Sequence, residues 1–301
     1  MFKGSLVPLV TPFRNGKIDE DAFRRLVEWH IESGSHGITI TGTTGEPAAL
    51  SQDERKRIIE LAVEASDGRI PVMAGTGSVH HADTLELTAF AEQVGADAAV
   101  VIVPYYVRPS QEGLYQHFKA VADSTKLPVM LYNIPGRGGA NLEPETTVRL
   151  ARDCPNIFGV KESNKDFEHV ARVFHQTRDL GREFGVYSGI ELLTFPILAL
   201  GGAGMVSATG NVMPKETAEL YNLCAAGKWD EARGLHYYLT PINDAMFYET
   251  NPVPAKTALG LMGMIDPEVR LPLAPLSEAN RRKLIECLES YNLLPAAVAA
   301  D

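Results

Sequence analysis

Eight short apolar runs, separated by stretches of helical periodicity, constrain the fold of this chain more than any other feature. The runs cover Leu6–Val10, Gly37–Ile40, Ile70–Met73, Ala98–Val103, Val129–Leu131, Ile157–Val160, Phe184–Tyr187 and Gly204–Ser207. Helical stretches between them include Asp19–Ser33, Gln52–Ala65, Asp83–Val94, Gln111–Ser124 and Pro144–Asp153. Continuous apolar strands alternating with helices are typical of a parallel sheet covered on both faces. The pattern predicts an α/β fold, and eight units fit a closed (β/α)8 barrel better than an open sheet.

The chain after the eighth run sets the expected domain organisation. Two amphipathic stretches follow Val212, "PKETAELYNLCAAGKWDEARGLHYYL" and "SEANRRKLIECLESY". No linker rich in Pro, Gly or Ser divides the 301 residues. We therefore predict a TIM barrel over residues 1–212 and a C-terminal helical region over residues 213–301.

Charge and cysteine content exclude several classes of partner. The net charge of −10 argues against a nucleic acid, because phosphate binding needs a basic face. Cys154, Cys224 and Cys287 are far apart and odd in number, which indicates reduced thiols and no disulfide framework. The apolar stretch at the amino terminus is short and broken by Pro, unlike a signal peptide, and no run of about 18 apolar residues follows. We expect a cytoplasmic protein that binds small molecules and neither nucleic acid nor membrane.

Polar residues follow four of the predicted strands, where a barrel places its active site. The segments are "TGTTGEPAAL" after Ile40, "PYYVRPSQEG" after Val103, "YNIPGRGGAN" after Leu131, and Lys161 after Val160. The sequence therefore predicts that hydroxyls, phenols, a guanidinium and an amine converge on one rim.

Lys161 suits carbonyl chemistry. A lysine in a desolvated pocket loses its charge more easily and can condense with a ketone to a Schiff base. Nearby Tyr and Thr hydroxyls can carry the protons. The alternative is a surface lysine paired with Glu162 or another acid.

The other polar residues also allow two interpretations each. "GTTGE" at 42–46 is either a phosphate cradle or a tight turn capped by Thr side chains. Tyr105 and Tyr106 could be core or interface aromatics. Arg137, flanked by glycines, can reach a carboxylate or remain solvated.

Metal and nicotinamide chemistry are not indicated. The adjacent pair His80–His81 lacks the spacing that presents two imidazoles to one ion. No GxGxxG motif follows a strand. We expect neither a metal nor an organic cofactor.

Six motifs together resemble those of the dihydrodipicolinate synthase family, pyruvate-dependent class I aldolases and dehydratases that include N-acetylneuraminate lyase. They span nearly the whole chain: "GTTGE" at 42–46, "AGTG" at 74–77, "PYYVRPSQEGLYQHF" at 104–118, "YNIPGR" at 132–137, "GVKES" at 159–163 and "NPVPAK" at 251–256. The resemblance implies condensation of pyruvate with L-aspartate semialdehyde, a step of lysine and diaminopimelate biosynthesis.

The resemblance also implies the catalytic residues. Lys161 forms the Schiff base with pyruvate, which becomes an enamine and attacks the aldehyde. Tyr132 acts as proton donor and acceptor, and Thr43 links it to Tyr106. Tyr106 comes from a neighbouring subunit, so we expect an oligomer, a homotetramer built from dimers.

Four further residues are implied in substrate binding. Thr44 holds the pyruvate carboxylate through its hydroxyl and amide, and Arg137 faces the carboxylate of the second substrate. Gly189 and Val206 line the pyruvate pocket.

Two departures from the family pattern leave the second substrate open. Gly138 follows Arg137 where the family usually has Thr, and Ile190 and Glu191 follow Gly189 where Asp-Asp is frequent. Another pyruvate aldolase or a 2-keto-3-deoxy acid dehydratase therefore remains an alternative. A catalytically silent sugar-acid-binding barrel is a more remote one.

Feedback inhibition by lysine is expected to be weak. The positions that correspond to the lysine site of the family are Gln52, Arg55, Val79 and Asp83. Val79 offers no hydrogen bond, and Arg55 adds positive charge where an ammonium ligand would approach.

Overall fold

The computed structural model describes residues 2–295 as a closed barrel of eight parallel strands. The strands follow one another around the barrel in the order β1-β10-β9-β8-β7-β6-β5-β4, so neighbours in sequence are neighbours in space. Their bounds are β1 Gly4–Pro8, β4 Gly37–Ile40, β5 Val72–Gly75, β6 Ala98–Ile102, β7 Val129–Asn133, β8 Ile157–Glu162, β9 Gly185–Ser188 and β10 Gly204–Met205. The predicted (β/α)8 barrel is confirmed.

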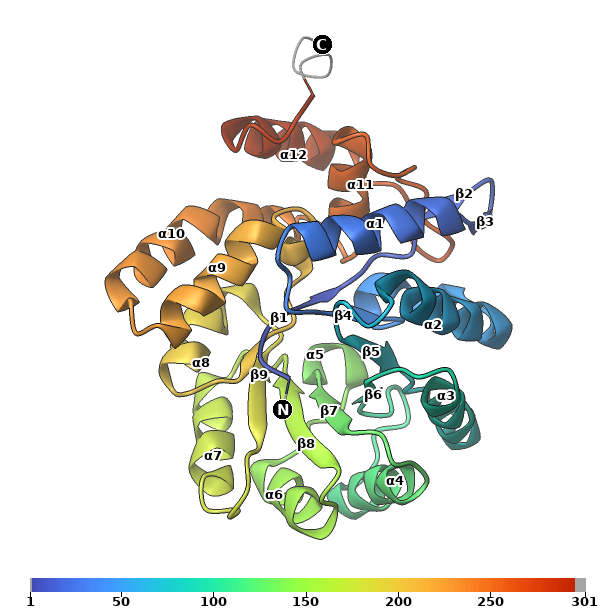
Figure 1. Cartoon of the computed structure of the whole chain (residues 1–301), viewed down its shortest axis with the longest axis vertical. Helices are drawn as coiled ribbons and strands as arrows, with labels where there is room; N and C mark the ends of the chain where they lie inside the picture. The colour runs from blue at the N-terminus through green and yellow to red at the C-terminus, as the bar shows by residue number, and fades with distance from the viewer. Residues whose placement is uncertain (1, 296–301) are drawn as a thin grey trace.

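A ring of helices surrounds these strands (Figure 1). Each strand is followed by one helix that returns the chain to the amino end of the barrel. These helices are α1 Glu20–Glu32, α2 Gln52–Ser66, α3 His81–Gln93, α4 Gln111–Asp123, α6 Pro144–Asp153, α7 Phe167–Thr177, α8 Thr194–Ala199 and α9 Pro214–Ala225. Side chains cap several of them; Ser51 and Glu54, for example, form a reciprocal capping box at the start of α2.

The C-terminal part is helical, as predicted. It contains α10 Trp229–Ala245, α11 Val253–Leu261 and α12 Glu278–Ser290. Figure 1 shows α11 and α12 on one side of the barrel, next to α1. A cluster of buried apolar side chains joins them to the barrel, including Leu26 of α1, Leu259 of α11 and Leu284 of α12. The proposed boundary after residue 212 falls between β10 and α9.

Short turns follow several strands at the carboxyl end of the barrel. They are the 3-10 turns η1 Thr43–Gly45, η2 Pro47–Ala49, η3 Glu191–Leu193 and η4 Ala208–Asn211, and the single helical turn α5 Pro135–Gly138. On the outer side, a two-stranded hairpin of β2 Phe13–Arg14 and β3 Lys17–Ile18 precedes α1. The sequence did not predict this hairpin, because two-residue strands carry no periodic signal.

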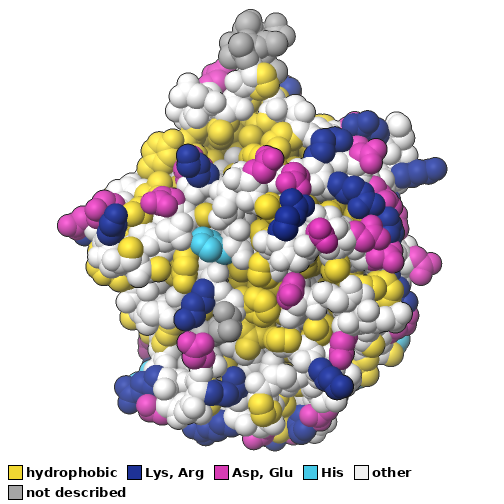
Figure 2. Space-filling model, in the orientation of Figure 1, with side chains coloured by type: hydrophobic (Ala, Val, Ile, Leu, Met, Phe, Trp, Pro, Cys, Tyr) yellow, Lys and Arg dark blue, Asp and Glu magenta, His cyan; other side chains and the backbone are white. Residues whose placement is uncertain are grey.

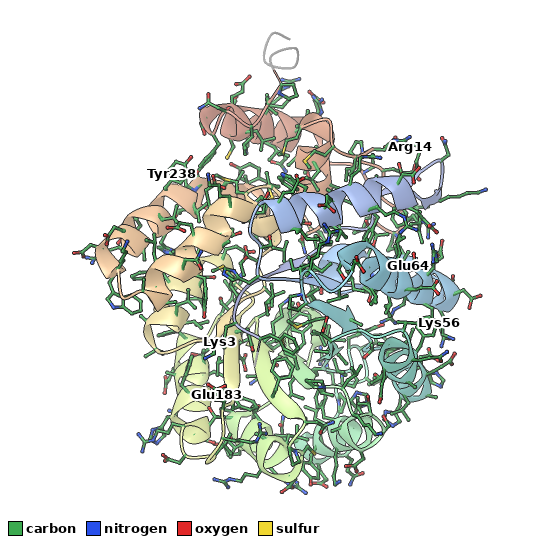
Figure 3. All side chains as sticks on the ribbon, viewed as in Figure 1. Lys3, Arg14, Lys56, Glu64, Glu183 and Tyr238 are labelled. Carbon is green, nitrogen blue, oxygen red and sulfur yellow. The ribbon has the colours of Figure 1, made fainter. Side chains whose placement is uncertain are left out.

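An ion pair marks the amino end of the barrel. Lys3 and Glu183 lie side by side in Figure 3 and form an ion pair at 3.4 Å. They precede β1 and β9 and therefore lie at the amino end of the strands.

Figure 2 shows positive and negative side chains interspersed over the face in view. Among the described residues, no helix is long and apolar enough to cross a membrane.

Candidate active site

A pocket opens at the carboxyl end of the barrel, among the βα turns. We call it the inner pocket; its volume is about 60 Å³. The structure brings seven of the eight predicted site residues to its wall: Thr43, Thr44, Tyr132, Arg137, Lys161, Gly189 and Val206. These residues lie at or just after the ends of β7, β8, β9 and β10, on the turn after β4, and, for Arg137, on the helical turn α5 after β7.

Lys161 lies in the wall of the inner pocket, near the end of β8. Its side chain is largely buried, with 7% of the residue exposed. The Nζ atom lies over the ring of Tyr132, 4.1 Å from the ring centre. The Tyr132 hydroxyl lies 3.3 Å from Oγ1 of Thr43, within hydrogen-bonding distance. An amine, a phenol and a hydroxyl therefore follow one another along the pocket wall.

The pleat of β8 explains why Lys161 faces the pocket. Side chains alternate along a strand, so Lys161 points into the barrel and Glu162 points to the surrounding helices. There Glu162 accepts a hydrogen bond from Asn133 at 3.0 Å and lies 3.4 Å from Nε2 of His169. Burial raises the pKa of the Glu162 carboxyl. The alternative pairing of Lys161 with Glu162 is contradicted.

The "GTTGE" segment forms the tight turn η1. Thr41 and Glu46 flank it with left-handed φ angles of 51° and 54°. Such angles are costly for a β-branched residue and cluster at functional sites. Thr44 is buried, and its Oγ1 accepts a hydrogen bond of 3.0 Å from Nδ2 of Asn251. Asn251 also accepts a bond of 3.2 Å from Arg137 through its backbone carbonyl.

Gly189 leaves room for the Lys161 side chain. A Cβ atom at position 189 would lie 2.8 Å from Cε of Lys161 and 2.1 Å from Oγ of Ser163. Ser163 donates a hydrogen bond of 3.1 Å to the Gly189 carbonyl. Because Gly189 has no side chain, the space next to Lys161 stays open.

A second, larger pocket adjoins the first. This outer pocket has a volume of about 270 Å³ and shares Thr43, Tyr132, Arg137 and Asn251 with the inner one. The rest of its wall is mainly apolar and includes Pro47, Ala49, Val100, Ile102, Tyr105, Pro252 and Leu273. Molecules bound in the two pockets would therefore lie next to each other.

Comparison with known proteins identifies the family. A family model described as the dihydrodipicolinate synthetase family matches residues 1–291. The chain belongs to this family. A 4-hydroxy-tetrahydrodipicolinate synthase of Thermus thermophilus is 48% identical over 296 residues, 98% of each chain.

Solved structures of dihydrodipicolinate synthases have the same fold. The enzyme from Aquifex aeolicus is 42% identical, with a TM-score of 0.95 over 98% of this chain and 100% of that one. The chloride-inhibited enzyme from Acinetobacter baumannii, complexed with pyruvate, is 39% identical, with a TM-score of 0.94 over the same shares of the two chains.

Tyr106 is the one predicted site residue that this chain does not place at either pocket. It is 89% exposed and has a left-handed φ of 72°. Its backbone N–H donates to the Gly138 carbonyl at 3.2 Å, which ties its loop to the Arg137 turn. Tyr105 instead lines the outer pocket.

Of the residues that depart from the family pattern, Glu191 lies in the wall of the inner pocket, whereas Gly138 and Ile190 line neither pocket. Glu191 is 6% exposed. Its Oε1 accepts a hydrogen bond of 2.7 Å from the Ala208 amide. Burial raises the pKa of Glu191, while its backbone hydrogen bonds and nearby Lys161 act in the opposite direction. At Gly138, a Cβ atom would meet only the Val103 carbonyl, at 3.9 Å, so the backbone leaves room for a Cβ atom.

Asn251 and Ser163 also line the inner pocket, although neither was predicted as a site residue from the sequence. Both stand in motifs that the sequence shows, "NPVPAK" and "GVKES". Ser163 lies two residues after Lys161. Side chains two positions apart on an extended chain face the same side, so this spacing could have indicated Ser163. No local signal indicated Asn251, because its contact with Thr44 joins residues 207 positions apart.

The four positions that the resemblance relates to lysine inhibition line neither pocket, although Arg55 contacts the backbone of the outer pocket wall. Val79 is partly exposed, and Arg55 is buried with its Nη2 donating to the carbonyls of Gly75 and Gly77 at 2.8 and 3.1 Å. Weak lysine inhibition stays a prediction. In the described part of the chain, no cluster of three or more His, Cys, Asp or Glu could hold a metal ion.

Proposed function

We propose that this chain is a 4-hydroxy-tetrahydrodipicolinate synthase that condenses pyruvate with L-aspartate semialdehyde through a Schiff base on Lys161. The enzyme names of its relatives and the pyruvate complex of the Acinetobacter baumannii structure support the reaction and its first substrate. One observation carries the assignment of Lys161. Its amine is buried at the carboxyl end of a barrel strand, directly over a tyrosine ring in a pocket of small volume.

The reaction begins with attack of the Lys161 amine on the keto carbon of pyruvate. Loss of water from the carbinolamine gives an imine, and loss of a methyl proton gives an enamine. The enamine carbon then bonds to the aldehyde carbon of the second substrate. The amino group of that substrate displaces Lys161 from the imine and closes the ring, so that one water is lost overall.

The polar residues of the pocket supply proton transfer and binding. Tyr132 lies next to the amine and can pass protons to and from the carbinolamine through its hydroxyl, with Thr43 as its hydrogen-bond partner. Thr44 binds the pyruvate carboxylate. Arg137 stands where the two pockets meet and pairs with the carboxylate of the semialdehyde. This chemistry uses no metal or organic cofactor.

We also propose that Tyr106 completes the site of a neighbouring subunit in a homotetramer built from dimers. A tyrosine that is 89% exposed on a loop beside the outer pocket supports this arrangement. The three free cysteines support a reducing, cytoplasmic location.

Borohydride trapping tests the role of Lys161. Pyruvate plus borohydride should add one reduced pyruvate adduct to the intact chain, and peptide mapping should place it on Lys161. Lys161→Ala should neither label nor turn over, whereas the exposed Lys165→Ala control should do both. Labelling of the Lys161→Ala variant would overturn the assignment.

A side-by-side substrate assay tests the second substrate. Turnover of L-aspartate semialdehyde, followed through an NADPH-dependent reductase, should exceed cleavage of sialic acid and dehydration of keto-deoxy sugar acids. Arg137 can hold a short carboxylated aldehyde, while the glycines around it offer few partners to a polyol. Turnover of a keto-deoxy acid without turnover of the semialdehyde would disprove the synthase assignment and leave the Lys161 chemistry intact.

A further inference from the structure

Lys256 of α11 is a fully buried lysine that the proposed reaction does not use. Its exposed fraction is 0%. The Nζ atom donates to a carboxylate oxygen of Glu46 at 2.7 Å and to the Thr11 carbonyl at 2.8 Å. It also lies 4.2 Å from the centre of the Phe13 ring. This ammonium group therefore joins the C-terminal region to two segments of the barrel.

Glu46 places the other end of this ion pair directly against the active-site turn. It follows Gly45 and ends η1 with a left-handed φ of 54°. Glu46 is itself buried, with 4% exposed, and it lines the outer pocket. Its second carboxylate oxygen accepts from the backbone N–H of Arg270, at 3.4 Å. Both oxygens of the carboxylate are therefore held by the C-terminal region.

The same C-terminal segment reaches the turn at a second point. Asn251, five residues before Lys256, donates to the Thr44 hydroxyl at 3.0 Å. The turn is thus fixed at Thr44 by an amide and at Glu46 by an ammonium. Figure 1 shows α11, the helix carrying Lys256, near α12 in the C-terminal part, far in sequence from the turn that Lys256 contacts.

Stability alone is a weak explanation of such a pair. Removing two charges from water carries a large desolvation cost, which their mutual attraction does not always repay. Burial lowers the pKa of Lys256, and Glu46 acts against that shift. The ion pair does, however, fix the conformation of the turn. Thr41 and Glu46, at the two ends of the turn, have left-handed φ angles, and without the bonds to Lys256 this strained backbone could relax.

We propose that Glu46 and Lys256 are positioning residues, which set the Thr43–Thr44 turn for binding the pyruvate carboxylate. The inference rests on the proposed function and deepens it. By this inference the C-terminal helical region contributes to the active site. Lys256 of α11 holds Glu46, and Glu46 holds the turn that binds the pyruvate carboxylate. Loss of the bridge should weaken pyruvate binding more than it slows the chemistry at Lys161.

Three variants separate positioning from stability. Lys256→Met removes the ammonium and leaves a buried carboxylate. Glu46→Gln keeps an oxygen that accepts a hydrogen bond from Lys256, so it is the conservative variant. The double variant Glu46→Gln/Lys256→Met leaves no buried charge but has no bridge. Lys119→Met, which breaks the exposed Lys119–Asp123 pair of 2.6 Å on α4, is the matched control.

The readouts are the pyruvate concentration that half-saturates the borohydride-trapped adduct, the steady-state KM and kcat, and the urea midpoint. We expect Lys256→Met and the double variant to raise the half-saturating concentration about tenfold or more, with adduct still formed at high pyruvate. Glu46→Gln should keep the half-saturating concentration within about threefold of that of the unmodified protein, because its amide oxygen still accepts from Lys256, although the bond from the Arg270 N–H is lost. The urea midpoint of the double variant should recover relative to Lys256→Met.

The double variant decides the outcome even if Lys256→Met fails to fold. Pyruvate affinity that stays weak while stability recovers supports positioning. A normal half-saturating concentration in the double variant, or equal losses in kcat and in the affinity for both substrates, would overturn it. If the unmodified protein forms no adduct with pyruvate, the proposed function fails; if it forms one and the double variant matches it, only this inference fails.

Discussion

At the scale of single residues, the inner pocket depends on the space around the Lys161 side chain. Lys161 and Tyr132 stand in motifs long enough to indicate their chemistry from sequence. The need for glycine at position 189 has a different origin. The two atoms that would clash with a side chain there, Cε of Lys161 and Oγ of Ser163, belong to β8 and to the residue that follows it. The sequence could indicate that Gly189 lines the pocket, but only the packing of β9 against β8 shows why no side chain fits.

Gly189→Ala should strongly slow adduct formation without unfolding the barrel. The new Cβ would lie 2.8 Å from Cε of Lys161, so the amine has to leave its position over Tyr132. We expect a loss of about 100-fold or more in the rate of pyruvate-dependent trapping. Gly136→Ala is the control, because a Cβ atom there meets nothing within 4 Å. Equal trapping rates for the two variants would contradict this account.

At the scale of secondary structure elements, the βα turns are held by contacts that local sequence does not encode. All eight strands appear close to their predicted bounds, since each is a continuous apolar run. The connections between turns are side-chain contacts across the barrel end. Asn141, after the Arg137 turn, accepts hydrogen bonds from Asn133 at 2.9 Å and from Asn164 at 3.1 Å. It thus ties the Arg137 turn to the ends of β7 and β8.

Asn141→Ala should weaken binding of the aldehyde substrate more than that of pyruvate. The change removes the oxygen that accepts from Asn133 and Asn164, although Asn133 keeps its bond to Glu162. The loss costs about 1–3 kcal/mol of stability and frees the turn that carries Arg137. We expect KM for the semialdehyde to rise about tenfold and the half-saturating pyruvate concentration to stay within about twofold.

A matched control separates this effect from lost stability. Asn156, before β8, also makes amide hydrogen bonds, to the carbonyls of Ala122 and Thr125 at 2.9 and 3.2 Å, but at the amino end of the barrel. Asn156→Ala should lower the urea midpoint and leave both KM values unchanged. A similar rise in the semialdehyde KM for both variants would show that Asn141 acts through stability alone.

At the scale of the whole molecule, packing of the helices on the barrel encloses groups that composition alone does not reveal. The eight histidines could be counted from sequence, but their burial could not. His30 of α1 is fully buried where this helix meets the barrel, and its Nδ1 lies 3.0 Å from Oγ of Ser35. Burial lowers the pKa of His30 from its ordinary value of 6.5 to about 3. The fold therefore holds this imidazole neutral under conditions in which the unfolded chain protonates it.

This difference predicts the acid sensitivity of the fold. The folded-state pKa of His30 lies below the unfolded value. Relative to the unfolded chain, the folded protein is therefore most stable above pH 6.5, and its free energy of unfolding decreases as the pH falls toward 3. At pH 5 the loss from His30 alone is about 2 kcal/mol. The side chain of the His30→Gln variant cannot be protonated. Between pH 7.5 and pH 5, the free energy of unfolding of this variant should therefore fall by about 2 kcal/mol less than that of the unmodified protein. Urea titrations at the two pH values would measure this difference. The exposed His175→Gln should retain the full loss. If His30→Gln shows the same loss on acidification as His175→Gln, acid unfolding does not depend on the imidazole buried under α1.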